Sequence, residues 1–261
     1  MVPEAIRRRA SLAALSLAAV AAMPVAADGG APATIARIKA SIVAVGTFER
    51  LRNPQFSFAG TGFVVGDGLL IATNDHVVPR TVSRERGEDI AIAVPAAGGT
   101  AQIRIARRTA ASAGSDLALL RIEGKPLPPL AFGDADAVRE GESYLVTGFP
   151  IGSVLGLFPV THRAMIAAVS PIAIPAARAD QLDARSVRRL STPAFPVFQL
   201  DATAYPGNSG SPVYHPESGA VVGIVNSVFV KATREAALAQ PSGITYAIPA
   251  RQLIELLQDA R

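Results

Sequence analysis

The spacing of hydrophobic positions changes near residue 41, and this change predicts the architecture. Ile35 and Ile38 are spaced as on one face of a helix, so residues 32–40 are predicted to form a short helix. After them the apolar residues fall into short runs that are β-branched or alternate with polar residues, as strands require. The predicted strands are 41–48, 62–65, 69–72, 90–94, 101–107, 117–122, 143–147, 160–169, 195–200, 220–230 and 244–248.

Glycine and proline separate these runs, with almost no helical spacing between them. This pattern favours an all-β sandwich or barrel over alternating strands and helices. Three prolines in residues 124–129 remove the backbone donors that a sheet needs, so this segment is the best place for a connection between two domains. Residues 171–196, rich in Ala, Arg and Pro, are predicted to form a long surface loop.

The last segment returns to helical spacing. Pro249 suits the first position of a helix, and Leu253, Ile254 and Leu257 form an apolar stripe. A short amphipathic helix is therefore predicted over residues 249–261.

Composition narrows the possible chemistry. With 49% hydrophobic and 18% charged residues, the chain is not of the disordered class. The absence of cysteine excludes disulfides, thiolate nucleophiles, cysteine-ligated zinc and iron–sulfur clusters. A metal centre built from several histidines would need nearly all of His76, His162 and His215. Hydroxyls, carboxylates, amines and a few imidazoles remain.

The first 27 residues are predicted to be a secretory signal peptide. Residues 7–9 are arginines, the apolar run 10–22 is too short to span a bilayer, and small residues precede a cleavage point after Ala27. Cleavage removes three arginines and one glutamate, which halves the formal net charge of +4. A nucleic-acid partner is therefore not expected. We expect a periplasmic or extracellular protein with no stable membrane insertion after cleavage; an uncleaved anchor and twin-arginine export stay open as alternatives.

The most specific local string is residues 206–212, Pro-Gly-Asn-Ser-Gly-Ser-Pro. Glycine on each side of Asn208–Ser209 permits backbone conformations that can aim two N–H groups at one point. These amides could bind an oxyanion while Ser209 Oγ attacks the carbonyl that generates it. On this string alone, an ordinary turn is an equally good interpretation. It is not the nucleophile elbow of α/β-hydrolases, which needs glycine where Ser211 stands.

A serine nucleophile needs a base, and the base needs a carboxylate to orient it. His76 follows an apolar run, although a lone histidine there is more often structural. Asp116 opens a strongly apolar strand, where an unpaired charge would be costly; its alternative role is a strand cap. Asp75 is a rival acid, but neighbouring strand residues point to opposite faces, so it is poorly placed to reach the His76 ring.

Together the three strings point to one family. His76, Asp116 and Ser209 follow the chain order of chymotrypsin-type proteases. The chain resembles bacterial trypsin-like serine proteases, and two branches are similar: the HtrA/Deg heat-shock proteases and the glutamyl endopeptidases. The resemblance covers most of the chain after the signal and is carried by segments 60–65, 73–77, 116–119, 207–210, 222–224 and 243–249.

The resemblance implies a chymotrypsin-like double β-barrel with its active site between the barrels. The first barrel would span residues 28–125 and supply His76 and Asp116. The second would span residues 126–248 and supply Ser209. The terminal helix would follow, and no metal or cofactor is required.

By the scheme of that family, Ser209 is the nucleophile, His76 is the general base and then acid, and Asp116 orients the imidazole and stabilises its cation. The amides of Gly207 and Ser209 would form the oxyanion hole, and Asn208 would shape the turn between them. A polypeptide is the implied substrate.

Departures from the family pattern bear on specificity. HtrA proteases usually carry a second glycine where this chain has Ser211, which resembles the glutamyl endopeptidases instead. Those enzymes bind the substrate carboxylate with a histidine at the position of Val225. An uncharged pocket for small or medium apolar side chains is therefore expected. The expected substrate-contacting residues are Thr203, Ala204, Val225, Asn226, Ser227 and Val228. Too few residues follow Ser209 for a PDZ domain of about 100 residues, so none is expected.

The leading interpretation is an exported serine endopeptidase that acts through an acyl-enzyme. The alternative is a latent protease or non-catalytic double-barrel binding module that needs a partner to order the oxyanion loop, with residues 171–196 as the place where a regulator acts. An esterase would use the same chemistry and differ only in substrate.

Overall fold

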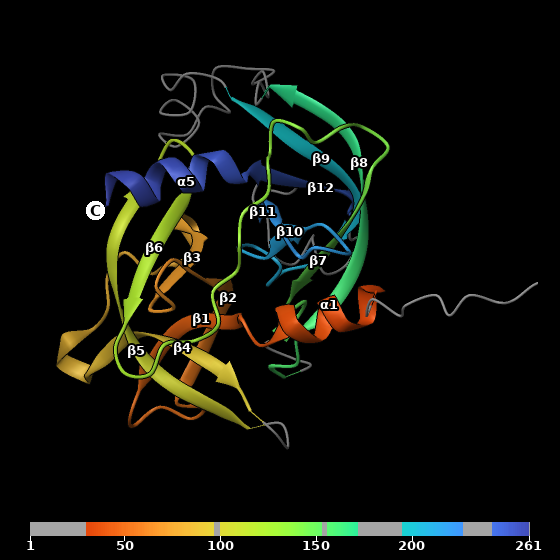
Figure 1. Ribbon diagram of the computed structural model, residues 1–261. Coiled ribbons are helices and arrows are strands. Elements are labelled where there is room, and N and C mark those ends of the chain that lie inside the picture. Colours follow the sequence, from red (N-terminus) through yellow and green to blue (C-terminus); the bar gives the residue numbers. More distant parts are fainter. Residues whose placement is uncertain (1–29, 97–99, 153–155, 172–194, 227–241, 261) are drawn as a thin grey trace, which may run out of the picture.

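The computed structural model describes residues 30–96, 100–152, 156–171, 195–226 and 242–260. Twelve strands in this part of the chain form two closed antiparallel barrels of six strands each. The first has the strand order β1-β2-β3-β6-β5-β4, and the second has the order β10-β11-β12-β9-β8-β7. Figure 1 shows the first barrel in orange to yellow-green and the second in green to blue. The predicted all-β double barrel with a short C-terminal helix is confirmed.

Each barrel uses strands that are consecutive in the chain. The strands of the first barrel are β1 (Ile42–Glu49), β2 (Phe56–Val65), β3 (Leu70–Asn74), β4 (Glu88–Pro95), β5 (Ala101–Ser112) and β6 (Leu117–Ile122). Those of the second are β7 (Ser143–Gly148), β8 (Val160–Pro171), β9 (Pro196–Ala204), β10 (Pro212–Tyr214), β11 (Val221–Asn226) and β12 (Ser242–Pro249). The proline-containing segment 124–129 lies between β6 and β7, where the chain passes from one barrel to the other.

The hydrophobic pattern places most strands correctly and misses parts of others. The predicted run 62–65 is only the last part of β2, which begins at Phe56. The three residues of β10 are too short for a period to show. The predicted strand 220–230 is described only as far as Asn226, and the predicted loop 171–196 lies almost wholly outside the described residues, as does the predicted signal peptide.

Two helices and two 3₁₀ turns accompany the barrels in the described chain. They are α1 (Gly30–Lys39), α5 (Ala250–Asp259), η1 (Asp75–Val77) and η2 (Arg84–Arg86). Pro249 is the residue before α5 rather than its first residue. Of the predicted stripe, Leu253 is buried, whereas Ile254 and Leu257 are only half-buried; the other buried residues of the helix are Ala250 and Leu256. Helix α5 contacts β5 and β6 of the first barrel and β11 of the second, and therefore packs across both.

The core combines many aliphatic side chains with a few buried aromatic ones. One continuous cluster of buried side chains joins the barrels: Phe63 and Leu117 of the first pack with Tyr214 and Ile224 of the second and with Leu253 of α5. Because burying apolar area is the main favourable contribution to folding, this shared cluster fixes the barrels against each other. The loops between them are thereby held in place.

Candidate active site

The register between two strands brings His76 to Asp116. Strand β3 pairs antiparallel with β6, and Asn74, its last residue, lies opposite Leu117, the first residue of β6. The turn η1 that follows β3 therefore lies beside the residue that precedes β6. The backbone N–H of Asp75 donates to the Asp116 carbonyl at 3.0 Å, and Nδ2 of Asn74 donates to the same oxygen at 3.1 Å.

The ring of His76 is held by the Asp116 carboxylate. Its Nδ1 lies 2.7 Å from Oδ2 of Asp116, and its backbone N–H donates to Oδ1 at 3.0 Å. Because the ionised carboxylate can only accept, Nδ1 of His76 is the donor in this contact, and in the neutral imidazole Nε2 is then an acceptor. Asp116 has φ = 53°, a left-handed conformation that Asp tolerates better than most residues with a Cβ.

A third contact to this carboxylate comes from the other barrel. Nδ2 of Asn226, at the end of β11, donates to Oδ2 of Asp116 at 2.8 Å. Burial raises the pKa of Asp116, but the hydrogen bonds and positive charge of His76 and the bonds from Asn226 and the His76 backbone outweigh burial and lower the pKa below its usual value. The carboxylate therefore stays ionised in a buried position.

Asp75, the rival acid, faces away from the ring of its neighbour. Its carboxylate accepts a bond from Nη1 of Arg108 at 2.7 Å, and Nη2 of Arg80 lies 3.6 Å from it. The structure thus separates the two carboxylates near His76: Asp116 contacts the imidazole, and Asp75 contacts a guanidinium on β5.

The candidate nucleophile lies in a turn between β9 and β10 whose glycines are sterically required. Gly207 has φ = 97°, and a Cβ on it would lie 2.3 Å from the Phe149 carbonyl oxygen. Gly210 has φ = 86°, and a Cβ there would lie 2.0 Å from the Thr61 carbonyl oxygen. The two glycines therefore allow both the left-handed conformation and the close approach of neighbouring backbone.

Glycine also lets the two turns of the site come together. A Cβ on Gly60 of β2 would meet the side chain of Val77 at 2.7 Å on one side and the Ser209 carbonyl oxygen at 3.1 Å on the other. The turn that carries His76 and the turn that carries Ser209 are thus separated at this point by one residue without a side chain. Ser209 itself is 7% exposed.

Thr61, a buried residue of β2, ties the nucleophile turn to both barrels. Its backbone N–H donates to the Ser209 carbonyl at 2.9 Å, and its hydroxyl donates to the Gly207 carbonyl at 2.7 Å. The same hydroxyl accepts a bond from the Phe149 backbone N–H at 3.1 Å. The sequence pattern does not single out Thr61, because its role depends on a contact between segments nearly 150 residues apart.

The peptide group between Pro206 and Gly207 is held by Ile151 rather than by Thr61. The Ile151 backbone N–H donates to the Pro206 carbonyl at 2.7 Å, and Ile151 takes a left-handed φ of 50° to do so. In a trans peptide the C=O and the following N–H point in opposite directions. The Gly207 N–H therefore points away from Ile151. Asn208, in the middle of the turn, donates its backbone N–H to the Tyr205 carbonyl at 3.1 Å.

The residues expected to contact the substrate differ in their exposure and in the groups that they contact. Thr203 is exposed near the end of β9, and Ala204 ends that strand. Val225 is buried, its N–H donates to the Ser211 carbonyl and its C=O accepts from Gly210, so its groups are engaged within the protein. The Asn226 side chain contacts Asp116. Residues 227 and 228 lie outside the described residues.

No cluster of three or more metal-ligating side chains occurs among the residues that the structure describes. His162 on β8 lies against the ring of Tyr205, with ring centroids 6.1 Å apart, and burial lowers its pKa. His215 follows β10. Within the described ranges no helix is long and apolar enough to cross a membrane.

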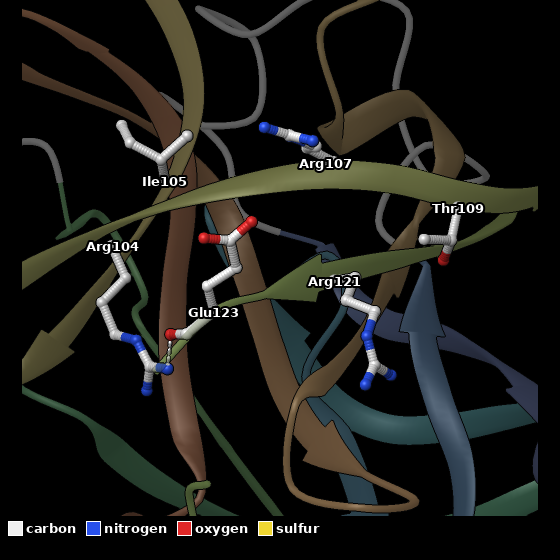
Figure 2. A pocket seen from close by; sticks show the side chains of 6 residues that line it. All are labelled: Arg104, Ile105, Arg107, Thr109, Arg121 and Glu123. Carbon is white, nitrogen blue, oxygen red and sulfur yellow. Dashed lines mark hydrogen bonds between the residues drawn. The ribbon is translucent and has the colours of Figure 1, made fainter. Parts of the chain in front are cut away.

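A groove of about 520 Å³ lies on the first barrel at strands β5 and β6, and His76, Asp116 and Ser209 are not among its lining residues. Figure 2 shows the side chains that line it: Arg104, Ile105, Arg107, Thr109, Arg121 and Glu123. Arg121 pairs there with Asp67 at 2.9 Å, and both side chains are nearly half exposed.

The central part of the chain matches the model of a known protein family. The model of the trypsin-like peptidase domain matches residues 60–224, which is more than half of the sequence and includes His76, Asp116 and Ser209. The chain belongs to the trypsin-like peptidase family.

This trypsin-like peptidase also resembles curated proteins of related type. It is 27% identical over 207 residues to a probable periplasmic serine endoprotease DegP-like of Marinomonas sp. (strain MWYL1), covering 79% of this chain and 36% of that protein. A protein of the same description from Hahella chejuensis (strain KCTC 2396) is 27% identical over 213 residues, with 81% and 38% covered. The chain thus spans little more than a third of the length of these relatives.

Solved structures agree on the fold of this trypsin-like peptidase. The HtrA-type protease AlgW with a tripeptide superposes with a TM-score of 0.60 at 24% identity, covering 87% of this chain and 62% of the other. AlgW with a decapeptide gives a TM-score of 0.61 at 22% identity, covering 88% and 67%. The double barrel is therefore the fold of HtrA-type proteases.

Proposed function

We propose that this chain is a serine endopeptidase in which Ser209, His76 and Asp116 form a catalytic triad. The observation that carries the proposal is the His76 imidazole held 2.7 Å from a buried, ionised carboxylate, in a turn that adjoins the turn of Ser209. Membership of a peptidase family and relatives described as serine endoproteases support the same activity.

The reaction follows from these groups. Nε2 of His76 takes the proton of Ser209 as Oγ attacks the peptide carbonyl, and Asp116 stabilises the resulting imidazolium. Collapse of the tetrahedral intermediate breaks the C–N bond, and the imidazolium gives its proton to the leaving amine. A water molecule, deprotonated by His76, then attacks the acyl-enzyme and releases the acid product and free Ser209.

The oxyanion is assigned to the backbone N–H groups of Gly207 and Ser209, with Asn208 forming the turn between them. The bond from Ile151 to the Pro206 carbonyl directs the Gly207 N–H away from Ile151, which supports its assignment as a donor to the oxyanion. Donors fixed in this way stabilise developing charge without reorganisation during the reaction.

The nucleophile turn is held by bonds to Thr61, Ile151 and Val225. This support favours an active enzyme over the latent or non-catalytic alternative, in which a partner must order the same turn. Hydrogen exchange of residues 203–210, measured with and without a covalent inhibitor, separates the two. Equal and strong protection supports the active enzyme, whereas protection that rises sharply on inhibitor binding supports latency.

The substrate is proposed to be a polypeptide with a small or medium apolar side chain at the cleavage position, because Val225 stands where a carboxylate-binding histidine would be needed. A peptide-library cleavage profile tests this specificity. Comparison of amide with ester substrates tests the esterase alternative, since only a peptidase cleaves the amide efficiently.

Export is proposed from the sequence of residues 1–27 and is supported by relatives described as periplasmic. Mass spectrometry of the exported protein is expected to find Asp28 at the N-terminus. An exported protein beginning at Met1 or Val2 would contradict cleavage.

The decisive experiment for the activity is covalent labelling with a fluorophosphonate probe. Wild-type protein is expected to be labelled, and Ser209→Ala is expected to give no labelling and a loss of several orders of magnitude in turnover. Ser211→Ala is the matched control, because it removes a neighbouring hydroxyl of the same turn. Freshly purified wild type that is not labelled would overturn the proposal.

A further inference from the structure

A pair of charged groups lies directly behind the turn that carries His76. Asp75, the first residue of η1, is 7% exposed, and its Oδ1 accepts the bond from Nη1 of Arg108. Nη2 of the same guanidinium donates to the Val78 carbonyl at 2.9 Å. Asp75 and Val78 flank His76, and the Val78 N–H donates to the Asp75 carbonyl at 3.2 Å. The side chain of Arg108 therefore donates hydrogen bonds to both ends of the turn.

The position of Arg108 suits this task. It lies on β5 opposite Leu120 of β6, and β6 in turn pairs with β3, the strand that leads into η1. The planar guanidinium presents donors in fixed directions, so a bond to each end of the turn sets the distance between them. A lysine has one charged centre and could not reproduce both contacts.

The hydrogen bonds that Asp116 accepts hold only one end of η1, and Arg108 holds the other end. Asp116 fixes the rotation of the imidazole and anchors the N-terminal side of η1, at Asp75 and His76. The C-terminal side of the turn, at Val78, is held by Arg108. The guanidinium also compensates the buried Asp75 carboxylate, which would otherwise place a second negative charge one residue from the imidazole. Arg80 is the other cation at Asp75, 3.6 Å away and largely exposed.

We propose that Arg108, acting through Asp75 and the Val78 carbonyl, is a positioning residue that holds the His76 turn in the geometry needed for proton transfer. The inference rests on the triad proposed above. It assigns to an Asp–Arg pair outside the triad the task of placing the base, and it gives Asp75 a role other than that of the triad acid.

The test is Arg108→Met, which keeps a long side chain and removes both bonds. A misplaced base slows the chemical step, so kcat is expected to fall about 10-fold or more with KM within about twofold. Fluorophosphonate labelling is expected to slow in parallel. The acid limb of the kcat/KM profile is expected to move to higher pH, because the Asp75 carboxylate, left with only the exposed Arg80 as its cation, then favours the imidazolium. Arg108→Lys is expected to fall between wild type and Arg108→Met.

The matched control is Arg121→Met, which breaks the Arg121–Asp67 pair of the same barrel at an exposed position and is expected to leave kcat and the pH profile unchanged. The double variant Asp75→Asn/Arg108→Met removes the uncompensated charge. It is expected to recover the melting temperature and the acid limb while kcat stays low, since the turn remains unanchored. If Arg108→Met does not fold, the kcat of the double variant is the measurement that tests the inference.

Wild-type kcat in Arg108→Met, or full recovery of kcat in the double variant, would overturn the inference and leave the triad standing. Wild-type protein that the probe does not label would remove the triad, and the inference with it. The two failures are therefore distinguishable in one set of measurements.

Discussion

The carboxamide of Asn226 donates to the carboxylate of Asp116 at 2.8 Å, across the junction of the two barrels. The donor lies at the end of β11 in the second barrel, and the acceptor precedes β6 in the first. The same carboxylate oxygen contacts the imidazole of His76. The electrostatic surroundings of Asp116 and His76 in the first barrel thus depend on a residue of the second barrel, which also carries Ser209.

Replacing Asn226 with Ala should weaken catalysis without unfolding the protein. A hydrogen bond to a charged group is worth about 1.5–3 kcal/mol, so kcat/KM is expected to fall about 10- to 100-fold. Asn226→Asp keeps the shape and replaces the donor with a second buried carboxylate, so its loss should be larger. Steady-state kinetics check both, and equal activity of Asn226→Asp and wild type would contradict the assigned contact.

The lowered pKa of Asp116 predicts how stability depends on pH. A depressed pKa in the folded state contributes stability that is fully present above the unfolded value of about 3.9 and is lost as the pH falls through the folded value. The difference in unfolding free energy between wild type and Asp116→Asn should therefore shrink below about pH 4. Urea unfolding from pH 7 to pH 2 measures it, and a constant difference would contradict the prediction.

Thr61→Val should loosen the nucleophile turn. Valine keeps the volume and removes the hydroxyl that bridges the Gly207 carbonyl and the Phe149 N–H. Two buried backbone groups then lose a partner, and a loss of about 1–3 kcal/mol in unfolding free energy is expected. Thr61→Ser keeps the hydroxyl and serves as the control. Labelling by the probe should slow in Thr61→Val and stay near the wild-type rate in Thr61→Ser.

Two glycines with similar backbone angles separate conformational strain from crowding. Gly141 has φ = 87°, and a Cβ on it would meet nothing within 4 Å, whereas a Cβ on Gly207 would meet the Phe149 carbonyl. Gly141→Ala should cost about 1–2 kcal/mol, the cost of the left-handed conformation alone. Gly207→Ala should cost about 1–3 kcal/mol more and abolish labelling. Equal unfolding free energies for the two variants would contradict the crowding.

The sequence predicts the strands well where burial imposes a simple period. Strand β6 is buried at nearly every position, and its apolar run predicts the observed bounds, 117–122. The short β10 has too few residues to show a period, and Gly60 and Thr61 interrupt the alternation in the first part of β2. Each of these two residues is fitted to an atom of the other barrel.

The residues of the candidate site likewise divide into those that the sequence reveals and those that only the structure reveals. The strings around His76, Asp116 and Ser209 can be recognised because each carries its chemistry locally. The contact of Asn226 with Asp116 cannot, because the two are 110 residues apart and alternation along a strand does not reveal which distant group a side chain meets. In the sequence, Arg108 is likewise only one of several arginines of β5. Its contact with the turn that carries His76 is visible only in the structure.

The bonds that join the barrels at this site also set when the site can exist. Thr61 and Gly207 are separated by 146 residues, and Asn226 and Asp116 by 110, so these contacts form only after both barrels have folded and docked. Until then, the imidazole of His76 and the carboxylate of Asp116, both supplied by the first barrel, have no serine beside them. The proposed endopeptidase is therefore expected to become active only when both barrels have docked.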